Sequence, residues 1–165
     1  MIQKKICMLG GYAVGKTSMV SRFVSSIFSE KYLSTVGAKV DKKALSVDGT
    51  DLTLVLWDIN GQDAFQTVQR SYLRGASGYL LVVDGTRLET FATAQELQRT
   101  AREVMGPVPF VLALNKADLA SSWQVDEAAL WQAAEAGWTI LRTSAKTGEG
   151  VEDAFRVLAK AMLTA

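Results

Sequence analysis

Cysteine is nearly absent from this sequence, with one residue in 165, so no disulfide can form within the chain. Cys7 lies in an apolar run, where we expect a buried structural thiol. An excess of charge is also missing, because 18 basic residues face 17 acidic ones and neither a basic tail nor a block of like charges occurs. The sequence therefore gives no support to nucleic-acid binding.

Long apolar stretches are missing as well. No stretch reaches the roughly 18 apolar residues of a membrane span, and the apolar core of the N-terminus is too short for a secretory signal, so we expect a cytoplasmic protein. The chain ends at "AKAMLTA" without a cysteine for prenylation, and no myristoylation start is present, so no lipid anchor is evident. Removal of a longer natural tail would give the same ending.

The residues that are present fit one globular domain, 1–165, in which 48% of residues are hydrophobic. Apolar stripes at helical spacing occur at 19–27 and 151–162. Short apolar runs bounded by Gly, Pro, Asn or Asp predict strands, and their continuous apolar character indicates burial on both faces, as in a parallel sheet. The predicted fold class is α/β, a three-layer sandwich with a mostly parallel sheet and strands near residues 6–9, 52–57, 79–83, 110–114 and 139–141.

One segment departs from this alternation. Residues 38–47 and 50–57 are joined by Asp48-Gly49, a dipeptide suited to a tight hairpin. Three lysines mark the first strand as an edge strand, and we favour protection against sheet-to-sheet pairing over a role in binding a partner for Lys39, Lys42 and Lys43.

The stretch "GGYAVGKT", residues 10–17, fits the pattern G-x-x-x-x-G-K-[ST] between a predicted strand and a predicted helix. Such a turn exposes backbone N–H groups at a helix N-terminus, which suits a polyphosphate. Lys16 would add a charge and Thr17 a hydroxyl ligand for Mg²⁺. The alternative is a glycine-rich turn with an exposed lysine. The predicted phosphate-binding residues are Gly11, Tyr12, Ala13, Val14, Gly15, Lys16, Thr17 and Ser18.

The stretch "NKAD", residues 115–118, follows a predicted strand, where ligands gather in a parallel sheet. An ionised Asp118 only accepts hydrogen bonds, so it suits the N1–H and amine of guanine and rejects adenine. Lys116 would lie along the base, and Asn115 would tie this loop to the phosphate loop. The stretch "SAK", Ser144, Ala145 and Lys146, would add a backbone N–H to guanine O6. A solvated loop after a strand is the alternative for both stretches.

The stretch "WDINGQ", residues 57–62, places Asp58 at the end of an apolar strand, where its carboxylate would hold Mg²⁺. Gly61 would contact the γ-phosphate through its N–H, and Gln62 would orient the attacking water. An ordinary polar turn is the alternative.

Together, "GGYAVGKT", "WDINGQ", "NKAD" and "TSAK", in this order, resemble the small GTPases of the Ras superfamily. "STVGAKV" and "AFQTVQRSYLRGASGYLLVVDGT" look closest to the Rab branch. The resemblance implies a P-loop NTPase G domain with sheet order 2-3-1-4-5-6 and five helices. It also implies Mg²⁺ as cofactor, a cycle between GTP and GDP, and slow hydrolysis stimulated by a GTPase-activating protein.

The resemblance also supplies residue roles. Thr35 matches the threonine that binds Mg²⁺ and the γ-phosphate in the triphosphate state, and Phe28 matches the aromatic residue that packs on guanine. The implied catalytic residues are Gln62, Lys16 and Thr35, and the implied metal ligands are Thr17, Thr35 and Asp58. Loops near residues 28–38 and 58–72 are expected to switch with the nucleotide and to be read by an exchange factor and effectors.

The sequence departs from the family pattern at Tyr12, Ala13, Asn60 and Asp63. We expect nucleotide binding to survive, because the loop uses backbone donors. Tyr12 either shields the γ-phosphate from an activating arginine or points into solvent. The alternatives to a GTPase switch are a nucleotide-binding module with very slow or no hydrolysis, and a nucleotide kinase with the same phosphate loop.

Overall fold

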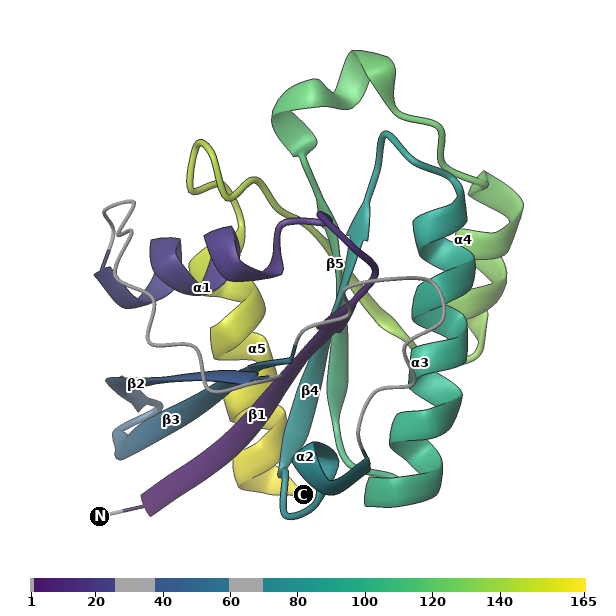
Figure 1. Ribbon diagram of the computed structural model, residues 1–165. Coiled ribbons are helices and arrows are strands. Elements are labelled where there is room, and N and C mark those ends of the chain that lie inside the picture. The colour runs from purple at the N-terminus through teal and green to yellow at the C-terminus, as the bar shows by residue number, and fades with distance from the viewer. Residues whose placement is uncertain (1, 26–37, 60–69) are drawn as a thin grey trace.

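The computed structural model describes residues 2–25, 38–59 and 70–165. Six strands of these residues form one sheet in the order β2-β3-β1-β4-β5-β6 (Figure 1). Only the β2–β3 pair is antiparallel among the described strand pairs. The strands are β1 (Ile2–Gly10), β2 (Ala38–Val47), β3 (Thr50–Ile59), β4 (Gly78–Asp84), β5 (Phe110–Asn115) and β6 (Thr139–Arg142). The expected sheet and its order are confirmed.

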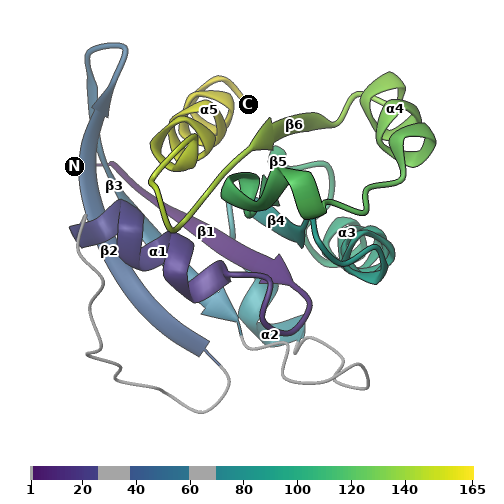
Figure 2. The same ribbon diagram turned by 90° about the horizontal axis from the view of Figure 1, so that it is seen from above.

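Helices cover both faces of this sheet. Figures 1 and 2 show α1 and α5 on one face and α3 and α4 on the other, so the expected three-layer sandwich is confirmed. A 3₁₀ helix, η1 (Ala117–Ser122), follows β5. The α-helices of the described residues are α1 (Lys16–Ser25), α2 (Arg70–Leu73), α3 (Glu89–Met105), α4 (Glu127–Glu135) and α5 (Val151–Thr164).

The central part of the sheet is apolar because both of its faces are buried. Along β1, Ile6 and Met8 pack in the cluster that includes α1 and α5, whereas Cys7 and Leu9 pack in the cluster that includes α3. Cys7 is fully buried, as expected, and burial raises the pKa of its thiol to about 12. This thiol stays protonated near neutral pH.

The predicted hairpin is also present. Asp48 and Gly49 have φ angles of 50° and 81°, both positive, as a type I′ turn requires. β2 lies at the edge of the sheet, so its predicted edge position is confirmed, and the protective role of its lysines stays a prediction. The strands extend beyond their predicted apolar runs, because polar residues such as Lys4 also pair with β3.

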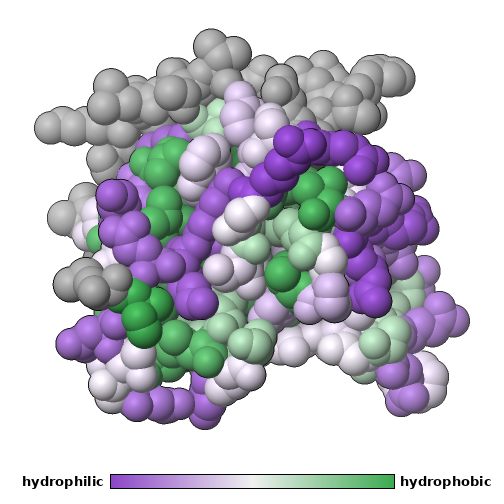
Figure 3. Space-filling view, turned by 90° about the horizontal axis from the view of Figure 1, so that it is seen from below, coloured by the Kyte–Doolittle hydropathy of each residue, from purple (hydrophilic) through white to green (hydrophobic). Residues whose placement is uncertain are grey.

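The carboxyl ends of the parallel strands all lie on the same side of the sheet, where the sequence motifs occur at the ends of β1, β3, β5 and β6. Figure 3 views the molecule from the opposite end, where hydrophilic residues and patches of hydrophobic residues are mixed. Within the part of the chain described here, no helix combines the length and the apolar character that a bilayer crossing requires.

Candidate functional site

The phosphate loop, residues 10–17, joins β1 to α1, and its packing requires both motif glycines. A Cβ on Gly10 would lie 2.7 Å from the Val82 carbonyl oxygen and 2.9 Å from a methyl group of Val14. Gly15 has a φ angle of 103°, and a Cβ there would collide with the side-chain amide of Asn115. The glycine pattern therefore reflects tight packing against β4 and β5.

The two bulkier residues of the loop do not fill it. Ala13 adopts a φ angle of 58°, in the left-handed region that favours glycine. The Tyr12 side chain is 67% exposed, so its phenol lies at the surface rather than within the loop. The close neighbours of Gly10 and Gly15 include neither of these two side chains.

Lys16 is buried at the N-terminus of α1, and its Nζ donates to the Gly10 carbonyl oxygen over 3.4 Å. Burial lowers the pKa of Lys16, while the nearby carboxylate of Asp58 opposes this effect. The hydroxyl of Thr17 donates to Oδ2 of Asp58. Lys16, Thr17 and Asp58, predicted from two separate motifs, therefore lie together.

Asp58 carries an unpaired acceptor that fits a cation. Its side chain is 2% exposed, and its Oδ1 atom has no hydrogen-bond partner among the described residues. A carboxylate oxygen beside a hydroxyl suits Mg²⁺, which commonly takes few protein ligands and completes its shell with phosphate oxygens and water. The described residues contain no group of three His, Cys, Asp or Glu side chains that could hold a metal ion. The donor set thus fits an ion that arrives with a nucleotide.

Asn115 connects the phosphate loop to the predicted base-binding loops. Its Nδ2 atom donates to the Val14 carbonyl oxygen over 2.9 Å, which matches the tie expected from sequence. Its Oδ1 atom accepts the Thr143 hydroxyl at 3.1 Å and the Ala145 N–H at 3.3 Å. One buried amide therefore holds segments from three parts of the chain.

The loop after β6 also orients the carboxylate predicted to read the base. The Ser144 hydroxyl donates to Oδ1 of Asp118 over 2.7 Å. Asp118 itself is exposed, so a bound base would have to cover its carboxylate before the lack of a donor could count against adenine. The Ala145 N–H is shared with Asn115, so contact with a base oxygen would compete with that bond.

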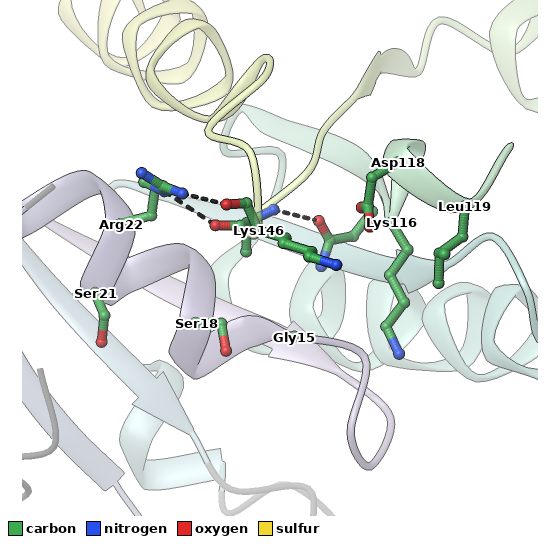
Figure 4. Close-up of a pocket in the computed structure, with 10 residues that line it drawn as sticks. Gly15, Ser18, Ser21, Arg22, Lys116, Asp118, Leu119 and Lys146 are labelled. Atoms are coloured by element: carbon green, nitrogen blue, oxygen red, sulfur yellow. Dashed lines mark hydrogen bonds between the residues drawn. The ribbon is translucent and has the colours of Figure 1, made fainter. Parts of the chain in front are cut away.

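A pocket of about 510 Å³ lies between α1 and these two loops (Figure 4). Seven predicted residues line it: Gly15, Ser18, Asn115, Lys116, Asp118, Ala145 and Lys146. Ser21, Arg22 and Leu119 also line it, and no sequence motif predicted them. Arg22 donates from Nε to the Ala145 carbonyl oxygen over 3.0 Å and from Nη2 to the Lys146 carbonyl oxygen, so α1 supports the "SAK" loop.

Several predicted residues lie outside the described residues. They are Phe28, Thr35, Asn60, Gly61, Gln62 and Asp63. The roles inferred for them from the resemblance remain predictions.

Comparison with known proteins agrees with this geometry. A model of the Ras family matches residues 5–164. The chain belongs to the Ras family. It is also 34% identical over 161 residues to the Ras-related protein Rab-13 of Canis lupus familiaris, a match that covers 96% of this chain and 79% of the relative.

Membership of the Ras family establishes the activity. The protein is a Rab-like small GTPase, a molecular switch that binds GTP and GDP and hydrolyses GTP. The alternative of a nucleotide-binding module without turnover is not favoured. As members of this family do in general, the chain works with nucleotide, regulators and effectors.

Proposed function

We propose that GTP and GDP bind across the carboxyl ends of the parallel strands. The phosphates would lie on residues 11–18, and guanine would lie in the pocket between α1 and the "NKAD" and "SAK" loops. The observation that carries this proposal is the Asn115 side chain, which holds both the phosphate loop and the Ala145 backbone. A nucleotide joins a phosphate chain to a base, so a ligand of this kind needs both loops at a fixed separation.

The phosphate end of the site supplies positive charge and fixed donors. Lys16 is already desolvated, so its ammonium group interacts strongly with a phosphate oxygen. Thr17, Asp58 and, from the family resemblance, Thr35 would hold Mg²⁺. When bound, Mg²⁺ neutralises charge that develops on the phosphate oxygens during transfer.

Hydrolysis requires a water molecule oriented toward the γ-phosphate, and the protein takes little covalent part in the reaction. We assign water orientation to Gln62 and recognition of the γ-phosphate to Thr35 and the Gly61 N–H, on the family resemblance. Loss of the γ-phosphate removes these contacts, so residues 28–38 and 58–72 would change order and partners would read that change. We also propose that the protein acts in the cytoplasm, where it meets an exchange factor, an activating protein and effectors.

The role of Gln62 is tested by single-turnover release of phosphate from GTP-loaded protein. We expect Gln62→Leu to slow release at least tenfold without weakening GTP binding, because water orientation matters in the transition state. Equal rates for the variant and the parent protein would remove Gln62 from the chemistry.

The role of Asp118 is tested by base exchange. Asp118→Asn should shift preference from GTP toward XTP, because the amide nitrogen can donate to the C2 carbonyl of xanthine. Competition for a fluorescent nucleotide measures both affinities. An unchanged preference for GTP would mean that another group reads the base.

A further inference from the structure

The turn after β4, residues 84–87, lies between the phosphate loop and the "NKAD" loop, residues 115–118, which is called the base loop below. No sequence motif identifies this turn. Asp84 pairs with Asn115 across β4 and β5, and its side chain is only 1% exposed. Oδ2 of Asp84 contacts Nζ of Lys116 at 2.8 Å and Nε of Arg87 at 3.0 Å. A buried carboxylate thus binds one cation from the base loop and one from its own turn.

Arg87 extends this network to the phosphate loop. Its Nη2 atom donates to the carbonyl oxygen of Tyr12 over 2.6 Å, across 75 positions of sequence. The guanidinium group therefore uses two edges of its rigid fork, Nε on Asp84 and Nη2 on Tyr12. Lysine could keep the charge but lacks this planar pair of donors.

The geometry of a peptide bond gives this contact a consequence for phosphate binding. The described residues contain no cis peptide bond, so the Tyr12 C=O and the Ala13 N–H point in opposite directions from one rigid plane. When Arg87 fixes the carbonyl, it also aims the Ala13 N–H away from itself. Asn115 acts in the same way on the Val14 carbonyl and hence on the Gly15 N–H.

We propose that Arg87 is a positioning residue that holds the Tyr12–Ala13 peptide in its phosphate-binding orientation and, through Asp84, joins the phosphate loop to Lys116. This inference rests on the proposed assignment of residues 11–18 to the phosphates. Arg87 touches neither nucleotide nor metal in this scheme. Its effect therefore depends on how much of the phosphate loop a ligand uses.

Two ligands separate this role from a general structural one. GDP engages the loop with a phosphate chain, whereas GMP offers a single phosphate and uses least of the loop. Binding of both ligands to Arg87→Ala, Arg87→Lys and the parent protein is measured by competition with a fluorescent GDP, together with thermal melting. Arg99 is an exposed residue of α3, and Arg99→Ala controls for the loss of one positive charge.

We expect Arg87→Ala to weaken GDP binding about tenfold, as for loss of a charge-assisted hydrogen bond, and to change GMP binding less than twofold. Arg87→Lys should retain most of the melting temperature because it keeps a cation beside Asp84, yet show most of the loss in GDP affinity. Arg99→Ala should match the parent protein in both measurements.

Three results would overturn the inference. They are unchanged GDP binding in both Arg87 variants, equal losses for GDP and GMP, and full recovery of GDP binding in Arg87→Lys. If Arg87→Ala does not fold, Arg87→Lys alone decides between these outcomes. A parent protein that retains no guanine nucleotide would instead remove the proposed function, and with it this inference.

Discussion

Asp84 allows a prediction in which pH changes stability by a calculable amount. Burial alone would raise the pKa of this carboxyl group, but hydrogen bonds from Lys116, Thr86 and Arg87 outweigh burial and lower the pKa from 3.8 to about 2. Since the pKa is lower in the folded state, the ionised group stabilises the fold above about pH 4. That contribution is lost as the pH falls toward 2.

The magnitude follows from the linkage between protonation and folding. Each pKa unit corresponds to about 1.36 kcal/mol, so the full contribution of Asp84 is roughly 2.5 kcal/mol near neutral pH. The same relation gives a loss of about 1 kcal/mol between pH 6 and pH 3. Replacement by asparagine removes the titrating group and keeps the shape of the side chain.

The assay is urea unfolding of the parent protein and of Asp84→Asn at several pH values from 6 to 3, with the same saturating concentration of GDP in every sample. We expect the difference in unfolding free energy between the two proteins to shrink by about 1 kcal/mol at pH 3. Glu96→Gln, at an exposed position of α3, controls for removal of a carboxylate. A difference that stays constant or grows on acidification would refute the stabilised carboxylate.

Two further predictions concern packing. Gly10→Ala should destabilise the fold by about 1–3 kcal/mol in chemical unfolding, because its Cβ would meet the Val82 carbonyl oxygen at 2.7 Å, whereas Gly11→Ala, whose nearest contact would be Thr93 at 3.5 Å, should change stability far less. Equal effects would contradict the tight packing of Gly10. Phe155→Ala should cost about 3–5 kcal/mol, since the ring is fully buried and stacks in the core, and a loss below about 1 kcal/mol would contradict that burial.

Sequence reasoning predicted the fold and the motif residues because their signals are local. The continuous apolar run at residues 6–9 predicted a strand that is buried on both faces, and β1 is such a strand. Asp48-Gly49 predicted a tight turn because both residues tolerate positive φ angles. Sheet order came from the family resemblance, since strand spacing alone does not fix which strands are neighbours. The strand bounds were too short, because polar residues at strand ends also form ladder hydrogen bonds.

The supporting residues of the site were missed for a different reason. Arg22 and Arg87 bind backbone carbonyls 123 and 75 positions away, and no local pattern reports such a contact. Trp123 similarly donates its indole N–H to the Lys116 carbonyl oxygen over 2.8 Å. Asp84 did carry a signal, because it ends an apolar strand as Asp58 does, and that carboxylate could have been picked out from "LLVVDGT".

The central claim is that the loops at the carboxyl ends of the parallel strands hold a phosphate chain and select the guanine attached to it. Its most direct test is to identify, by chromatography and mass spectrometry, the nucleotide released on denaturing the purified protein, followed by competition between GTP and ATP in magnesium buffer. We predict bound guanine nucleotide and a GTP affinity at least a thousandfold above that for ATP, because adenine has an acceptor at N1 and would cover the Asp118 carboxylate without donating the N1–H bond that guanine supplies. Bound adenine nucleotide, or equal affinities for the two triphosphates, would contradict the account.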